Sequence, residues 1–245
     1  RWPIRGLQIH TMHPLELTNL LEGWGPNEPE DEAGFEAMLP DWDRALEWAV
    51  ANRQNRLQWV LLWAESWGDF GDSEERQSRL LALTTRAHEF AIEVGIDTPL
   101  RQQQQQSFRL IREDGTLEEE LAQIRARVDW LMGAGFDYMT TEMGSTEFTS
   151  TDDTRTVAWM DELARYLDEA YGKRAAVKVH ASTGQTVDHY LDPETGEPLN
   201  YNFLPHYADA RLGVLPHTVQ HYGIDDPSPT YGNGDFGYMR QFLQG

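Results

Sequence analysis

The feature that most constrains the fold is an alternation of short apolar runs with amphipathic stretches, in which the apolar runs end on polar residues. The strand-like run 135–142 closes on the carboxylate of Glu142, and similar runs end at His10, Glu65, His180 and His217. Alternating strands and helices predict a parallel sheet with crossover helices. In α/β barrels the C-terminal ends of the strands carry the chemistry, so these polar residues indicate a functional site rather than a core.

The pattern predicts a TIM (β/α)8-type barrel that forms a single domain over residues 1–245. Strands are expected at 5–10, 56–63, within 95–111, at 135–142, 175–180 and 212–217, and helices at 35–53, 74–94, 117–132 and 153–171. Residues 182–201 contain Gly and Pro but no helical period, which indicates a hairpin or loop. A long loop at 225–233 and a helix at 236–243 complete the prediction. Because fewer than eight strands are found, we expect a barrel that is incomplete at its C-terminus and is completed beyond Gly245 or by another chain.

Composition limits the partners of the chain. Its 20 Lys and Arg stand against 41 Asp and Glu, a net charge of −21, which repels phosphate backbones and anionic lipid headgroups. We therefore expect neither nucleic acid nor a membrane as a partner. There is no Cys, which excludes disulfides and thiolate chemistry. Nine Trp and nine Tyr suit a site that stacks sugar rings, although they also suit a large core.

Three short motifs resemble the family 20 glycoside hydrolases, the β-N-acetylhexosaminidases. They are the run Arg5-Gly6-Leu7-Gln8-Ile9-His10-Thr11, the run Asn55-Arg56-Leu57-Gln58-Trp59, and a helix ending Ala91-Ile92-Glu93-Val94-Gly95-Ile96 before Asp97-Thr98-Pro99. The resemblance spans roughly residues 4–145 and implies a glycosidase barrel in which Arg5 contacts sugar hydroxyls. His10 stands where the family has Asp, and Thr140-Thr141-Glu142-Met143 stands where it has Gly-Gly-Asp-Glu. Only one carboxylate of the family's catalytic pair is therefore present.

Glu142 is the candidate general acid, because a carboxyl group beside Met143 and aromatic residues at a strand end can hold a proton near neutral pH. An ordinary strand-end ion pair is the alternative. Glu147, five residues further on, and Glu65, between Trp63 and Trp67, are the other candidate catalytic carboxylates. Retaining glycosidases hold their two carboxyl groups about 5 Å apart, and inverting glycosidases hold them further apart.

The predicted function is cleavage of O-glycosidic bonds of a carbohydrate by carboxylate acid/base catalysis, without a cofactor or metal ion. The predicted substrate-binding residues are Arg5, His10, Trp63, Trp67, His180, His217 and Tyr231.

Two other functions stay open. One is a carbohydrate-binding barrel without catalysis, because half of the family's carboxylate pair is missing. The other is a metal-dependent hydrolase that uses Glu142 with histidines at strand ends, drawn from His10, His13, His180, His206 and His217.

Overall fold

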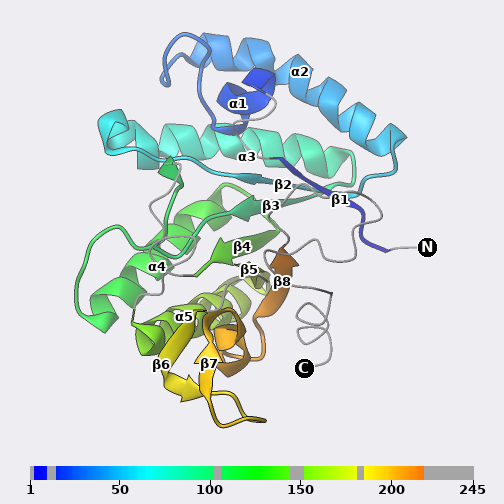
Figure 1. Ribbon diagram of the computed structural model, residues 1–245. Helices are drawn as coiled ribbons and strands as arrows, with labels where there is room; N and C mark the ends of the chain where they lie inside the picture. Colours follow the sequence, from blue (N-terminus) through cyan, green and yellow to red (C-terminus); the bar gives the residue numbers. More distant parts are fainter. Residues whose placement is uncertain (1–2, 10–14, 102–105, 144–151, 181–184, 218–245) are drawn as a thin grey trace. The chain divides into compact units, whose positions relative to one another are not determined.

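The computed structural model of the chain describes residues 3–9, 15–101, 106–143, 152–180 and 185–217 (Figure 1). Its six-stranded sheet takes the strands in the order β1 (Gly6–Ile9), β2 (Arg56–Val60), β3 (Glu93–Asp97), β4 (Tyr138–Glu142), β5 (Arg174–His180) and β8 (Gly213–His217). The pairs β1–β2, β2–β3 and β5–β8 are parallel. Strands in chain order with helices between them are the pattern of an α/β barrel, and the described residues supply six of its eight strands. The predicted fold class, an incomplete barrel of the TIM type, is confirmed.

The helices follow the strands in the expected alternation. They are α1 (Leu15–Leu21), α2 (Glu32–Ala51), α3 (Glu74–Glu89), α4 (Leu117–Gly133) and α5 (Asp153–Tyr171), with the 3-10 segments η1 (Glu65–Asp72) and η3 (Tyr201–Tyr207). Two short strands, β6 (Thr186–Leu191) and β7 (Pro198–Asn200), pair with each other in antiparallel fashion. The hairpin predicted for 182–201 is therefore confirmed, whereas α1, η1 and η3 were not predicted.

The chain divides into two compact units. One comprises Arg1–Thr98, Gln105–Leu110 and Ala126–Met139, and the other Pro99–Gln104, Ile111–Arg125 and Thr140–Gly245. The first unit thus holds β1 to β3 with α1 to α3, and the second holds α5, β5 to β8 and the C-terminal end of β4.

In the first unit, the start of α3 follows the sequence and its end does not. Ser73, directly before the predicted start, caps the helix, since its side-chain oxygen accepts a hydrogen bond from the backbone N–H of Arg76 at 3.0 Å. The helix ends at Glu89 rather than near Val94, because Ala91 takes a positive φ of 55° and turns the chain into β3. The third strand consequently begins at Glu93, before the predicted 95–111 window.

The core of the first unit is built on tryptophan. Trp42 of α2 and Trp59 of β2 are fully buried, and their rings meet edge to face with centroids 6.0 Å apart. Trp59 also contacts Phe136, at 5.3 Å. The Trp42 indole N–H donates to the Leu83 carbonyl at 3.0 Å, so its polar atom is satisfied. These tryptophans are core residues and do not stack sugars.

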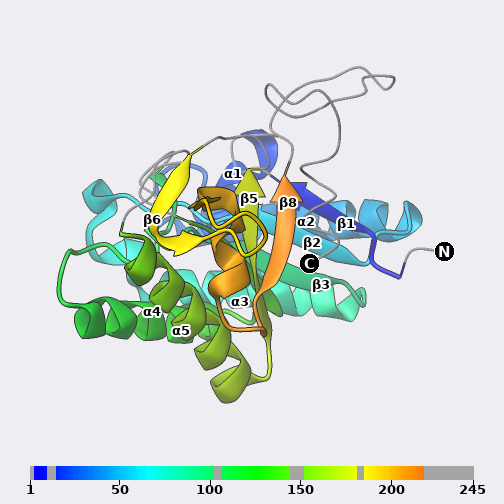
Figure 2. The same ribbon diagram turned by 60° about the horizontal axis from the view of Figure 1, so that its bottom comes forward.

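In the second unit, α5 has the predicted bounds. Asp152 caps its first turn by accepting hydrogen bonds from the N–H groups of Thr154 and Arg155, and Gly172 ends it in the left-handed conformation, with φ of 62°. After this turn, β5 runs beside β8, and Figure 2 shows the two strands pointing the same way. The predicted strands 175–180 and 212–217 are confirmed to within one residue.

The hairpin is held to the N-terminus of α5 by a buried carboxylate. Asp153 accepts hydrogen bonds from the backbone N–H groups of Asp188 and His189, at 2.8 and 2.9 Å, and from Nδ1 of the His189 ring, at 2.6 Å. Only 4% of the Asp153 side chain is exposed. One carboxylate thus fixes the hairpin that leads into η3.

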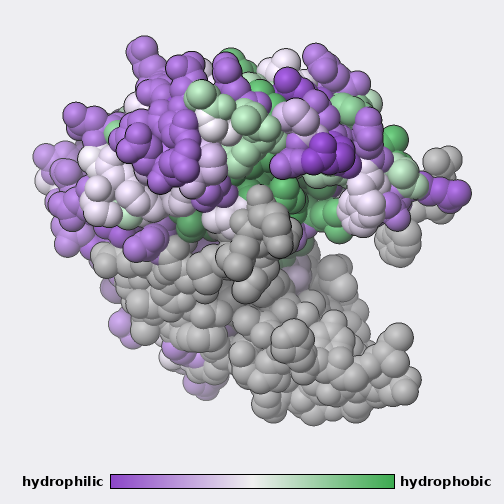
Figure 3. Space-filling view, turned by 90° about the horizontal axis from the view of Figure 1, so that it is seen from above, coloured by the Kyte–Doolittle hydropathy of each residue, from purple (hydrophilic) through white to green (hydrophobic). Residues whose placement is uncertain are grey.

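Seen from the side of α1 and α2, the coloured surface is mostly hydrophilic, with small apolar areas between polar ones (Figure 3). Trp48 and Val50 of α2 are exposed, which is common for single apolar residues on a protein surface. None of the helices in the described ranges is both long and apolar enough to cross a bilayer. The predicted loop at 225–233 and helix at 236–243 lie outside the described residues.

Candidate functional site

Glu142 lies where the sequence predicted a functional carboxylate, on the last residue of β4. Its Oε1 lies 2.5 Å from Nζ of Lys178, which comes from β5. The exposed fraction is 19% for the Glu142 side chain and 8% for the Lys178 side chain. The pair is therefore shielded from most solvent, and its electrostatic attraction is much less screened than that of a surface pair.

The position of Lys178 follows from the alternation of side chains along β5. Its neighbours Val177 and Val179 are fully buried on one face of the strand, so Lys178 projects from the opposite face. In register with Lys178 on β8 is Leu215, which is 42% exposed. The face that carries Lys178 is thus less completely covered than the face that carries the valines.

Tyr201, the first residue of η3, adds a phenol to this neighbourhood. It is 3% exposed, its backbone N–H donates to the Gln185 carbonyl at 2.8 Å, and its hydroxyl has no hydrogen-bond partner among the described residues. Burial raises the pKa of the Tyr201 phenol above its ordinary value, and the nearby negative charge of Glu142 raises it further. The phenol therefore keeps its proton and can donate it in a hydrogen bond.

Together these side chains offer a carboxylate, an amine and a phenol within one unit of the chain. A carboxylate can accept a proton or attack an electrophilic carbon. A lysine can donate a proton as the ammonium and attack a carbonyl group as the neutral amine. A phenol can stabilise an oxyanion by donating a hydrogen bond to it. Lys178 and Tyr201 were not predicted from the sequence. The available signal for Lys178 was a charged residue inside the apolar run 175–179, and no comparable signal marked Tyr201.

The predicted histidines are only partly described. His180 and His217 are register partners at the C-terminal ends of β5 and β8, so their backbones are neighbours, as the predicted strand ends require. His206 lies exposed on η3, with its ring centroid 5.7 Å from that of Phe203. The part of the chain that the structure describes contains no group of three or more side chains that could hold a metal ion. His10, His13, Glu147 and Tyr231 lie outside the described residues.

Glu65 does not end a strand. Because β2 ends at Val60, Glu65 falls at the start of η1, where it is exposed. The indole N–H of Trp63 donates to Asp72 at 3.1 Å, and the Trp67 ring packs edge to face on Trp24, with centroids 4.6 Å apart. Both tryptophans therefore have contacts within their own unit, and the predicted arrangement of Glu65 at the end of a strand is corrected.

Arg5 lies directly before β1, beside the start of β2. Its Nε donates to the Arg53 carbonyl, and its backbone N–H donates to Asn55 Oδ1 at 2.8 Å. This is the N-terminal end of the strands, whereas barrel sites lie at the C-terminal end. The location does not support the predicted contact of Arg5 with sugar hydroxyls, because the guanidinium binds the turn before β2.

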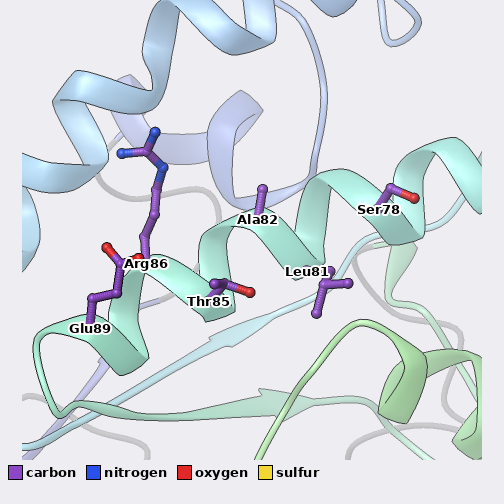
Figure 4. A pocket seen from close by; sticks show the side chains of 6 residues that line it. All are labelled: Ser78, Leu81, Ala82, Thr85, Arg86 and Glu89. Atoms are coloured by element: carbon purple, nitrogen blue, oxygen red, sulfur yellow. The ribbon is translucent and has the colours of Figure 1, made fainter.

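A hollow of about 480 Å³ lies elsewhere, along the surface of α3. The side chains that line it are Ser78, Leu81, Ala82, Thr85, Arg86 and Glu89, all on one helix (Figure 4). Arg86 reaches toward α2 and forms an ion pair with Asp43 at 2.6 Å. Because the Arg86 guanidinium already forms an ion pair with Asp43, we regard the hollow as a gap beside a helix and not as a candidate site.

No protein-family model matches the chain, and no curated protein matches it either. Among solved structures, a point mutant of the O-GlcNAc hydrolase of Thermobaculum terrenum superposes with a TM-score of 0.50 at 12% identity, over 87% of this chain and 40% of that chain. CpGH84B gives a TM-score of 0.49 at 9% identity, over 86% and 33% of the two chains. A point mutant of the trehalose-6-phosphate hydrolase of Bacillus licheniformis gives 0.44 at 11%, over 73% and 44%.

The chain therefore spans less than half the length of each of these proteins. At such low identity the likeness concerns the fold alone. The resemblance to family 20 stays a prediction. What the structure supports is the coarser statement: the chain has an incomplete α/β-barrel fold like that of part of the O-GlcNAc hydrolase.

Proposed function

We propose that this chain belongs to a glycosidase that cleaves O-glycosidic bonds, with Glu142 as a catalytic carboxylate. The observation that carries the proposal is the place of Glu142, a shielded carboxylate at the C-terminal end of a barrel strand with a charged partner 2.5 Å away. The glycoside hydrolase-like fold supports the reaction class.

The ion pair with Lys178 bears on the role of Glu142. A general acid must enter the reaction protonated, whereas a partner of an ammonium group serves best as a negatively charged carboxylate. Glu142 therefore suits the base or nucleophile of a carboxylate pair better than the acid that the sequence predicted. Glu147, five residues further along the chain, is the proposed second carboxylate.

The test uses aryl glycosides with poor and good leaving groups. Glu142→Gln keeps the shape of the side chain and removes the charge, so turnover should fall at least about a hundredfold. For a base or nucleophile, adding azide to Glu142→Ala should restore turnover and yield a glycosyl azide, because the small anion occupies the vacated position. Glu194→Gln, an exposed carboxylate of the hairpin turn, is the matched control and should leave turnover unchanged.

If turnover survives Glu142→Gln, Glu142 is not a catalytic carboxylate, and Glu147 becomes the first candidate for that role. Wild-type protein that binds saccharides in calorimetry but hydrolyses none at any pH would instead support the binding-only alternative. Glycosyl azide formation distinguishes catalysis from binding without any assumption about the natural sugar.

A further inference from the structure

The chain uses lysine very sparingly. Of its 20 Lys and Arg residues, only Lys173 and Lys178 are lysines. Arginine is always charged and binds anions through a planar fork, whereas the primary amine of lysine can lose its proton and act as a nucleophile. Lys178 lies on a barrel strand, in a chain that takes arginine for 18 of its 20 basic residues, and this choice indicates a need for the amine itself.

The surroundings of Lys178 fit such a need. Its side chain is 8% exposed, and Glu142 Oε1 lies 2.5 Å from Nζ, close enough to take the ammonium proton directly. The buried hydroxyl of Tyr201 is near enough for the charge of Glu142 to act on it, and has no hydrogen-bond partner among the described residues. The amine thus has a proton acceptor in direct contact, and a buried hydroxyl group lies near that acceptor.

We propose that Lys178 is a nucleophilic amine that forms an imine with the carbonyl group of an aldehyde or ketone. Glu142 takes the ammonium proton, and the nitrogen lone pair attacks the carbonyl carbon. The attacking nitrogen, which now bears two protons and a positive charge, gives one proton to the carbonyl oxygen, and the product is a neutral carbinolamine. Tyr201 donates a hydrogen bond to that oxygen. Glu142 then returns its proton to the hydroxyl group, which leaves as water and gives the iminium ion. In sum, one ammonium and one carbonyl compound become one iminium and one water, and nothing is oxidised or reduced.

The charge of the chain narrows the class of ligand. A net charge of −21 disfavours the approach of carboxylated or phosphorylated carbonyl compounds. The expected ligand is an uncharged aldehyde or ketone. This activity goes beyond glycoside cleavage, because imine formation breaks no glycosidic bond.

Reductive trapping tests the proposal. The whole chain is incubated with glycolaldehyde and sodium cyanoborohydride, which reduces an imine to a stable secondary amine, and modified residues are located by peptide mass mapping. Lys173, in the turn before β5, is an internal reference of higher exposure. Labelling of Lys178 should be at least about tenfold faster than that of Lys173, since positioned proton transfer accelerates by about a hundredfold or more. Equal or faster labelling of Lys173 would overturn the proposal.

Glu142→Gln separates a reactive amine from an ordinary ion pair. If Glu142 moves the protons, labelling of Lys178 should fall about tenfold or more in this variant, with Lys173 unchanged. If the carboxylate only holds the ammonium in place, its removal should leave the labelling rate of Lys178 the same or raise it, and the proposal fails. Lys178→Arg, which keeps the positive charge, should lose the label at this position. If a variant does not fold, the ratio of the Lys178 and Lys173 labelling rates in the wild type still tests the proposal. No glycoside is used in these experiments, so a negative result leaves the proposed hydrolysis untouched.

Discussion

Glu22 and Arg76 form a fully buried ion pair in the first unit, and we expect it to make stability fall as the pH rises. The Glu22 Oε2 atom accepts hydrogen bonds from Arg76 Nη2 at 2.9 Å and from the Leu62 backbone N–H at 2.8 Å, while its Oε1 has no partner among the described residues. Desolvation by burial outweighs the attraction of Arg76 and raises the pKa of Glu22 from 4.5 to about 7.

The sign follows from the protons bound in each state. Between pH 4.5 and about 7 the folded protein holds a proton on Glu22 and the unfolded chain does not. The stability that Glu22 contributes is therefore fully present below pH 4.5 and is lost by about pH 7. At about 1.4 kcal/mol for each pH unit of difference, the loss amounts to about 3 kcal/mol. Protonation is tolerated in the folded state because Arg76 also donates to the carbonyl groups of Glu22, Gly71 and Leu62.

The experiment compares urea unfolding of the wild type and Glu22→Gln from pH 4 to 8, followed by tryptophan fluorescence. Glu22→Gln cannot titrate, so its stability relative to the wild type should rise by about 3 kcal/mol over this range. Glu28→Gln, at an exposed position of the same unit, controls for the change in net charge. A stability difference between Glu22→Gln and the wild type that stays constant with pH, or moves the other way, would refute the reasoning.

Three further substitutions test local features. The hydrogen bond and the charge of Asp153 raise the pKa of His189 above its ordinary value of 6.5. The stability that the pair contributes is therefore fully present below pH 6.5 and is lost as the pH rises through the raised pKa. Asp153→Asn should lower the His189 pKa in an NMR titration and speed amide exchange in the hairpin. Gly95→Ala should destabilise by about 1–3 kcal/mol in urea unfolding, because the added Cβ would clash with the ring of Tyr138; an unchanged midpoint would contradict the packing. Gly172→Ala meets no neighbouring atoms but must keep a φ of 62°, so thermal unfolding should show a loss of about 1 kcal/mol from strain alone.

The parts of the fold that the sequence predicted best are those with local chemical signals. The bounds of α5 follow from the capping Asp152, a helical apolar period and the terminating Gly172. The end of α3 has no such signal, because Ala91 rather than glycine takes the positive φ there, and the predicted helix ran on into β3. Glu65 was misplaced because the apolar run of β2 continues past the hydrogen-bonded strand into η1.

The candidate site was predictable only in part, because its contacts depend on strand register. The place of Glu142 at a strand end could be inferred from the pattern of the run that contains it. Its pairing with Lys178 could not, since the two are brought together by neighbouring strands and are far apart in sequence. Tyr201 belongs to a 3-10 segment that has no recognisable periodicity. Sequence patterns thus locate the end of a strand but do not identify the side chains that meet there.

The Glu142–Lys178 pair also allows a test of whether it serves stability or chemistry. Removing one partner of a shielded pair leaves an uncompensated charge, so Lys178→Met should destabilise by up to about 3–5 kcal/mol, the range for buried pairs, reduced by the 19% exposure of Glu142. Replacing both, in Glu142→Gln with Lys178→Met, removes that charge, and the double variant should lie within about 1 kcal/mol of the wild type. Urea unfolding of the two single variants and the double variant measures the coupling. A double variant as unstable as Lys178→Met alone would show that the pair holds the fold together, and would remove the reason for regarding a charged pair at this position as functional.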